Sequence, residues 1–138
     1  MTSRKIFFFV LFISLMIEIS PAWSATVKER AKMEKEAVKL FRKGKPDEGL
    51  TVLKQLTETN PDYANGHMNY GSMLFTKGQF LYQTGKEAEA EPLFHEAEQS
   101  LTKAIQLFGE DDKKVKGQCY YLLGDIYAYV YRNHKKAA

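Results

Sequence analysis

The stretch from His67 to Gly109, "HMNYGSMLFTKGQFLYQTGKEAEAEPLFHEAEQSLTKAIQLFG", decides the fold of this chain. In its second half, apolar residues recur at alternating spacings of four and three, at Ala90, Phe94, Ala97, Leu101, Ala104 and Phe108. This spacing puts them on one face of a helix. Charged residues fill the opposite face, at Glu87, Glu91, Glu96, Glu98 and Lys103. Because residue 26 onward shows no alternating strand pattern and no Gly/Ser linker, the sequence predicts an all-α protein.

Turn residues divide the chain into five predicted helices. Gly44-Lys45-Pro46 separates the first from the second, because proline suits the first position of a helix. Asn60-Pro61 ends the second, and we expect Asp62 to cap the third. Thr84–Lys86 and Gly109–Asp112 separate the rest, with Asp111 or Asp112 expected to cap the fifth. The predicted helices are 27–43, 47–59, 64–84, 87–108 and 113–134, and their short connections predict antiparallel neighbours.

Three segments resemble one another: "EAVKLFRKGKPDEGLTVLKQLTETNP" (36–61), the stretch quoted above, and "YYLLGDIYAYV" (120–130). This pattern resembles the tetratricopeptide repeat, in which Leu-Gly and Tyr lie on a first helix and Ala, Phe, Ala and Pro on a second. The positions that carry the resemblance are Gly71, Gly85, Ala90, Phe94, Ala97, Gly124, Tyr127 and Pro61. The first segment departs from the pattern, since Glu36-Ala37 replace Leu-Gly and Gly49 stands where alanine is usual.

The resemblance implies a short right-handed α-solenoid of stacked antiparallel hairpins, with units at about 30–63 and 64–112 and a half repeat at 113–138. In such hairpins Gly71 and Gly124 would let two helices approach closely, with Tyr70 and Leu74 filling the seam. The middle unit exceeds the usual period of ~34 residues by about two turns in each helix. Its "GKEAEAEPLFHEA" (85–97) is similar to the second helix of kinesin-light-chain-type repeats, which tolerate a proline such as Pro92.

The resemblance also implies a concave groove that holds a peptide or protein segment. Its lining would come from the first helix of each unit: Glu34, Val38, Phe41, Asn65, Met68, Ser72, Phe75, Tyr121, Asp125 and Tyr129. Tyrosines are enriched at protein interfaces, although surface tyrosines that only shield the core remain an equal alternative. One subgroup of the family captures the C-terminal carboxylate of a chaperone with a Lys and an Asn on the first helix of a repeat. We exclude this subgroup, because Glu34 and Val38 stand at those two positions. A groove bearing Glu34 and Asp125 is expected to repel a carboxylate.

A second tyrosine stripe runs along the last predicted helix. Tyr120, Gly124, Tyr127 and Tyr131 are spaced as a packing face, and the resemblance assigns this face to the core. No second helix follows to cover it, so we expect a partly uncovered apolar patch, a feature that marks interfaces. Two interpretations follow: the last helix docks on another copy, giving a homo-oligomer, or the sequence is a truncated form of a longer repeat protein, which we favour.

The first 24 residues have the features of a secretory signal peptide. Arg4 and Lys5 precede "IFFFVLFISLMI" (6–17), and the small residues Ala22 and Ser24 indicate cleavage after Ser24. The alternative is an uncleaved anchor, but Glu18 interrupts the apolar run before the ~20 residues that a spanning helix needs. We therefore expect a signal peptide at 1–24, a helical domain at 25–138, and an exported protein, periplasmic or secreted.

Composition and motifs argue against several other functions. The net charge of the whole chain is +3, and its Lys and Arg are interleaved with Glu, so nucleic-acid binding is not expected. Cys119 is the one cysteine, which excludes an internal disulfide, and we expect it to be buried. His67, His95 and His134 lack partners at metal-ligand spacing. The sequence thus predicts no catalytic residue, metal or cofactor, and indicates a protein-interaction or assembly module rather than an enzyme.

Overall fold

The structure is a computed structural model, and it describes residues 26–137. The predicted signal peptide lies outside these residues. Five α-helices make up the described chain: α2 (Val27–Arg42), α3 (Pro46–Thr59), α4 (Ala64–Gln83), α5 (Glu87–Leu107) and α6 (Lys113–Ala137). Residues 26–137 contain no strand. The prediction of an all-α protein is therefore confirmed.

The helix boundaries agree with the predicted ones except at the end of α6. The sequence predicts an end near residue 134, followed by a turn, whereas α6 continues to Ala137. No glycine or proline follows Gly124 within the helix, and lysine and alanine are good helix formers, so nothing there stops the helix.

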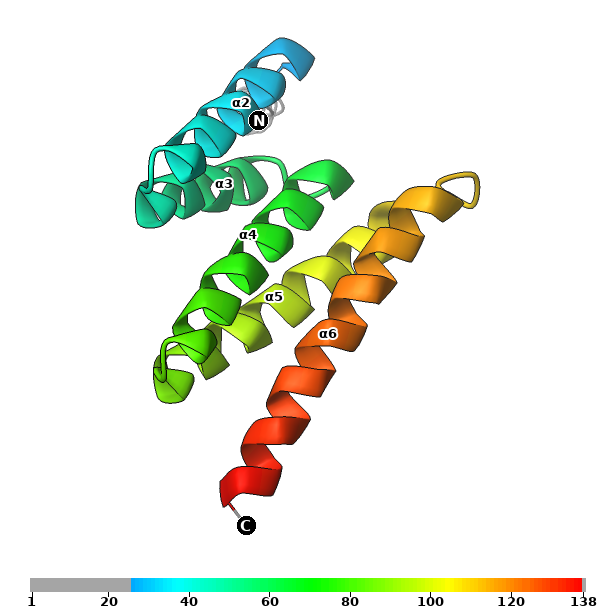
Figure 1. Cartoon of the computed structure of the whole chain (residues 1–138). Coiled ribbons are helices and arrows are strands. Elements are labelled where there is room, and N and C mark those ends of the chain that lie inside the picture. Colours follow the sequence, from blue (N-terminus) through cyan, green and yellow to red (C-terminus); the bar gives the residue numbers. More distant parts are fainter. Residues whose placement is uncertain (1–25, 138) are drawn as a thin grey trace, which may run out of the picture.

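The helices form two layers. In Figure 1, α2, α4 and α6 lie in front, and α3 and α5 lie behind them. α3 packs against α2 and α4, and α5 packs against α4 and α6. α4 and α5 run antiparallel: His67 and Gly78 of α4 meet Ser100 and Phe94 of α5 respectively, so the contacts advance in opposite directions.

Turns of the same kind connect the two helices within each hairpin, α2 to α3 and α4 to α5. Gly44 has φ of 74° and Gly85 has φ of 79°, values that favour glycine. In the first turn the backbone amide of Lys45 donates to the Leu40 carbonyl at 3.0 Å. In the second, the backbone amide of Lys86 donates to the Leu81 carbonyl at 2.9 Å. This is the Schellman arrangement, which satisfies carbonyls left open at a helix end. The turn chemistry therefore repeats along the chain with the hairpin.

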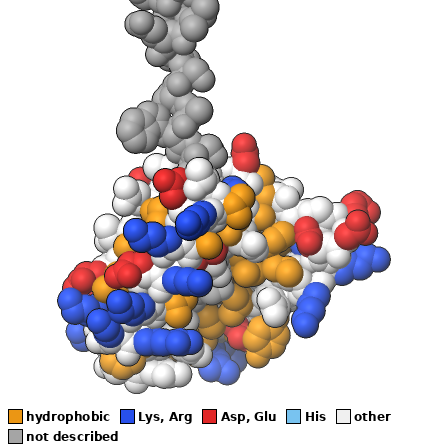
Figure 2. All heavy atoms as spheres, turned by 90° about the horizontal axis from the view of Figure 1, so that it is seen from above, with side chains coloured by type: hydrophobic (Ala, Val, Ile, Leu, Met, Phe, Trp, Pro, Cys, Tyr) orange, Lys and Arg blue, Asp and Glu red, His pale blue; other side chains and the backbone are white. Residues whose placement is uncertain are grey.

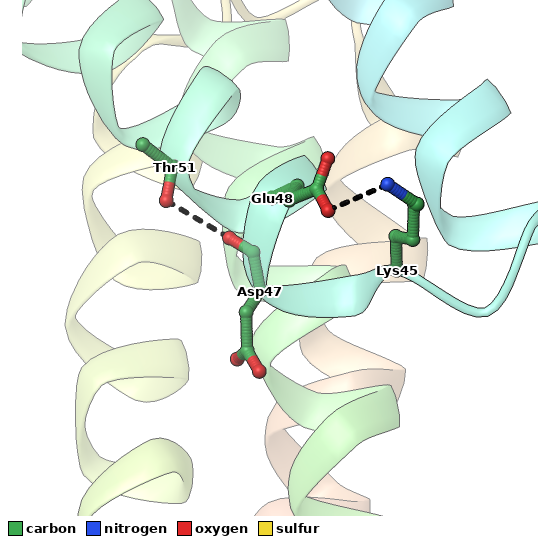
Figure 3. Close-up of polar contacts among 4 residues, drawn as sticks. All are labelled: Lys45, Asp47, Glu48 and Thr51. Carbon is green, nitrogen blue, oxygen red and sulfur yellow. Dashed lines mark hydrogen bonds and ion pairs between the residues drawn. The ribbon is translucent and has the colours of Figure 1, made fainter.

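The first turns of α2 and α3 are stabilised in different ways. Thr26 and Glu29 form a capping box at α2. α3 begins at Pro46, and Figure 3 shows its first turn, where Lys45 Nζ pairs with Glu48 at 2.8 Å and the Thr51 hydroxyl donates to the Asp47 carbonyl at 2.9 Å.

Asp62 does not cap α4, contrary to the prediction. The N-cap position belongs to Tyr63, which has extended backbone and makes no side-chain cap bond. The Tyr63 amide instead donates to the Asn60 carbonyl at 3.0 Å, closing a turn that puts Asp62 one residue too early.

Buried glycines let the helices of each hairpin approach closely. A carbon placed on Gly71 would lie 2.8 Å from Leu101 Cγ and 3.1 Å from the Ala97 carbonyl oxygen. A carbon on Gly49 would lie 2.9 Å from Phe41 Cδ2, which accounts for glycine where the repeat pattern has alanine. The core along these seams consists of Ala37, Leu50, Leu53, Leu56, Tyr70, Leu74, Phe75, Ala90, Phe94, Ala97, Leu101, Ala104, Cys119, Leu123 and Ile126.

The packing face of α6 differs from the predicted one. Cys119, Leu123 and Ile126 are buried, whereas the predicted stripe is open: Tyr120, Tyr127 and Tyr131 are 60%, 54% and 69% exposed. A carbon placed on Gly124 would meet nothing within 4 Å. The stripe is left uncovered within the described chain, as we expected from the sequence, because α6 packs on α5 through the adjacent face and no second helix there covers Gly124.

Gly71 and Gly124 thus form a matched pair for a stability test. We expect Gly71→Ala to lower the free energy of unfolding by about 1–3 kcal/mol, because the added methyl overpacks a closed seam. Gly124→Ala should raise it by roughly 0.5–1 kcal/mol, because alanine favours the helix and meets no neighbour. Urea unfolding followed by circular dichroism measures both, and equal effects would contradict the assigned packing.

Candidate functional site

A surface hollow of about 510 Å³ lies between α4 and α6. We call it the α4–α6 hollow. α4 contributes Met68 and Ser72 to its lining, one turn apart. α6 contributes the remaining residues: Lys114, Gly117, Gln118, Tyr121 and Leu122. The hollow combines apolar surface with a few polar groups, the composition that binding sites favour.

Helical spacing brings these side chains together. Lys114, Gln118 and Tyr121 are separated by four and three residues, so they share a face of α6. Met68, Ser72 and Tyr121 are residues that the sequence assigns to the groove. The sequence reasoning missed Lys114, Gly117, Gln118 and Leu122, because it followed the tyrosine stripe toward the C-terminus. Extending the same stripe toward the N-terminus of α6 would have found most of them.

An aromatic cluster closes the space between α4 and α6 beyond the hollow. The Tyr129 ring lies 5.2 Å from the Phe94 ring, 6.0 Å from Phe75 and 4.9 Å from Tyr82, centroid to centroid. Gln79 Nε2 also donates to the Tyr129 hydroxyl at 2.9 Å. Phe75 is 6% exposed. These contacts place Phe75 and Tyr129 in the packing between helices rather than on an open groove.

The physical reason for this burial is the rotation of the helix. Tyr129 lies eight residues after Tyr121, which at 100° per residue turns it about 80° away from the hollow and toward α5. Tyr121 itself is 71% exposed. Asp125, midway between them, is half-buried and does not line the hollow.

The predicted groove residues of α2 take three different positions. Glu34 is half-buried and accepts hydrogen bonds from the Tyr63 hydroxyl at 3.1 Å and from Asn69 Nδ2 at 2.9 Å. Val38 is exposed, whereas Phe41 packs into the α2–α3 seam against Gly49. Only Glu34 and Val38 thus face the shallow depression on α2, and they share it with Ala31, Lys35, Lys39, Arg42 and Lys43.

Asn65, on α4, is exposed and does not line either the α4–α6 hollow or the α2 depression. The ten predicted groove residues are therefore divided between these two concave areas, the helix packing and open surface.

Hydrogen-bonded tyrosines join the helices around the site. Burial raises the pKa of Tyr63, and the Glu34 carboxylate beside it raises it further. Burial and the bond from its hydroxyl to Glu96, at 2.5 Å, raise the pKa of Tyr70 well above its ordinary range. Both phenols are therefore neutral donors at physiological pH. Burial also raises the pKa of the Cys119 thiol, which is fully buried as predicted.

The histidine and acidic side chains of the described residues do not gather into a metal site. No group of three His, Cys, Asp or Glu side chains there could hold an ion. His67 Nε2 lies 2.8 Å from the Pro61 carbonyl oxygen, and His95 lies 3.9 Å from Glu98. None of the helices between residues 26 and 137 has the length and apolar character needed to cross a membrane.

Comparison with known proteins adds no assignment. No protein-family model matches the chain. A search of curated proteins likewise finds no match. The interpretation of the site therefore depends on its geometry.

Tyr129 and Tyr121 provide a matched test of the two environments on α6. We expect Tyr129→Ala to lower the free energy of unfolding by about 3–5 kcal/mol, because it leaves a cavity between Phe75 and Phe94. Tyr121→Ala should change it by no more than about 0.5 kcal/mol, as is usual for an exposed residue. Thermal unfolding of both variants measures the difference, and a large loss in Tyr121→Ala would argue against an open hollow.

Proposed function

We propose that this protein is a binding module that holds a peptide or protein segment on the face formed by α2, α4 and α6. The observation that carries the proposal is the α4–α6 hollow, which unites Met68, Ser72 and Tyr121 from two helices far apart in sequence. Tyr121 offers a large apolar ring with a polar tip and only two rotatable bonds, the type of side chain that dominates binding energy at interfaces.

The helix arrangement supports the same proposal. α2, α4 and α6 run in one direction in one layer: Arg30 stacks on Tyr63 and Glu34 bonds Asn69, so contacts between α2 and α4 advance together. Repeated antiparallel hairpins, each closed by the same glycine turn, fit the tetratricopeptide type of stacking. In that arrangement the first helices of successive units share one surface and the second helices share the other. On this proposal the protein is an exported assembly module rather than an enzyme.

Two tyrosines on α6 allow the proposal to be tested. Tyr121→Ala should reduce capture of a partner from a periplasmic or secreted-protein extract at least fivefold, because it removes a side of the hollow. Tyr131→Ala is the control, since Tyr131 is similarly exposed on the same helix but lies on another face. Affinity capture with quantitative mass spectrometry makes the comparison, and equal capture by both variants would show that the hollow is not the binding site.

A second candidate function is structural self-association, and one observation favours it. The stripe of Tyr120, Gly124, Tyr127 and Tyr131 is the face through which α6 would receive a partner helix, as α4 receives α5 at Gly71. Each of the three tyrosines is more than half exposed. In this alternative, a second copy of the chain covers the stripe.

Sedimentation equilibrium across a range of protein concentrations tests this alternative. The alternative is supported if the protein forms a dimer or larger assembly and the double variant Tyr120→Ala with Tyr131→Ala is a monomer. Tyr121→Ala serves here as the control and should leave the assembly unchanged. A chain that stays monomeric up to about 1 mM would exclude self-association through α6.

A further inference from the structure

The depression on α2 is strongly basic. Its lining includes Lys35, Lys39, Arg42 and Lys43, all exposed, beside the apolar Ala31 and Val38. Figure 2 shows many Lys and Arg side chains, with some Asp and Glu among them, on the left of the molecule, the side on which α2 and α3 lie in Figure 1. Hydrophobic side chains are exposed next to them. A basic surface beside an apolar one suits a ligand that carries both kinds of group.

These four basic side chains are not used within the fold. None of them forms an ion pair with another described residue, whereas Lys45, Lys77 and Lys86 pair with Glu48, Asp47 and Glu89. α2 itself carries Glu29, Glu34 and Glu36, but the largest group of carboxylates on one helix lies on α5 in the back layer. That helix carries one base, Lys103, against five carboxylates: Glu87, Glu89, Glu91, Glu96 and Glu98. Bases are thus in excess on α2, and carboxylates are in excess on α5.

Glu34 is the only carboxylate in the α2 depression, and the fold already uses it. Two donors bind one of its oxygens: the hydroxyl of Tyr63, the residue before α4, and the side-chain amide of Asn69 on α4. The sequence led us to expect that Glu34 and Asp125 would make the groove repel carboxylates. The structure alters this for α2, where one hydrogen-bonded carboxylate is outnumbered by four unpaired bases. Asp125 lies across the layer on α6 and does not face the depression.

The layer has different character at its two ends. The α2 end holds four bases, and α4 between the ends contributes the uncharged Asn65, Met68 and Ser72. The α6 end offers the apolar Tyr121 and Leu122 in the α4–α6 hollow, with one base, Lys114. With packed helices about 8–10 Å apart, the two ends are separated by roughly 20 Å. An extended chain covers this distance with about six residues at ~3.3 Å each.

We propose that this face binds an extended acidic polypeptide segment, with its carboxylates on Lys35, Lys39, Arg42 and Lys43 and an apolar side chain about six residues away in the α4–α6 hollow. The inference rests on the binding function proposed above and specifies the chemistry of the partner. Charge complementarity of this kind mainly increases the rate of association and the selectivity between partners. The affinity should therefore fall as salt rises.

Two fluorescein-labelled synthetic peptides test the proposal. The first has several consecutive Asp and Glu residues, a short uncharged spacer, and then Tyr and Phe. The second is identical except that Asn and Gln replace the acidic residues. Fluorescence anisotropy with residues 25–138 should show at least tenfold tighter binding of the acidic peptide at 50 mM salt, and a much smaller difference at 500 mM. Equal binding of the two peptides would contradict the proposal that the ligand is acidic, but it would not contradict the proposed groove.

Charge reversal on the protein supplies the second arm. Lys39→Glu with Arg42→Glu should weaken binding of the acidic peptide at least tenfold. Lys54→Glu with Lys103→Glu is the matched control, because it changes the net charge equally on the back-layer helices α3 and α5. If the control weakens binding as much, the effect is one of net charge alone and the proposed site is wrong.

Two further outcomes separate the inference from the proposed function. If neither peptide binds, the acidic segment is wrong, and the capture comparison of Tyr121→Ala with Tyr131→Ala still decides whether the hollow binds a partner. A labelled DNA duplex serves as an unrelated polyanion. If it binds as tightly as the acidic peptide and responds equally to Lys39→Glu with Arg42→Glu, the face is a general polyanion surface and the peptide inference fails.

Discussion

The fold depends on the close approach of α4 and α5. At Gly71 and Gly78 the absence of a side chain lets Leu101 and Phe94 lie within 2.8 Å of where a β-carbon would stand. This contact fixes the longest hairpin and positions Phe94, on which Tyr129 of α6 stacks. The direction of α6, and with it the opening beside Met68 and Ser72, therefore follows from how tightly the preceding hairpin closes.

The same cluster explains why the candidate site is short. α4 and α6 meet at Phe75, Gln79 and Tyr82, where Tyr129 fills the space between them, and they stay apart at Met68 and Ser72. A groove running the length of both helices would need this aromatic contact to be absent. The structure thus replaces part of the open surface with a packed aromatic junction, which holds α6 against α4 and α5.

The balance of basic and acidic side chains differs from helix to helix. Interleaved Lys and Glu suggest a surface without electrostatic preference, and the net charge of +3 agrees with that. Helical periodicity places these residues on different faces, so that Lys35, Lys39 and Arg42 of α2 form no ion pair with a described residue, while five carboxylates lie on α5. Such sorting affects which partners associate, and how fast, more than it affects stability.

For residues 26–137, the sequence by itself determined the number of helices, most of their ends, the two glycine turns and the buried face of α5. These follow from local chemistry: apolar spacing, positive φ at Gly44 and Gly85, and proline at the start of α3. Only the tertiary structure decided that Phe75 and Tyr129 are packed, that Ile126 rather than Tyr127 is buried on α6, and that Glu34 is hydrogen-bonded. The reason is geometric, because neighbouring faces of α6 have nearly equal apolar character, and the helices packed beside it select the one that is buried.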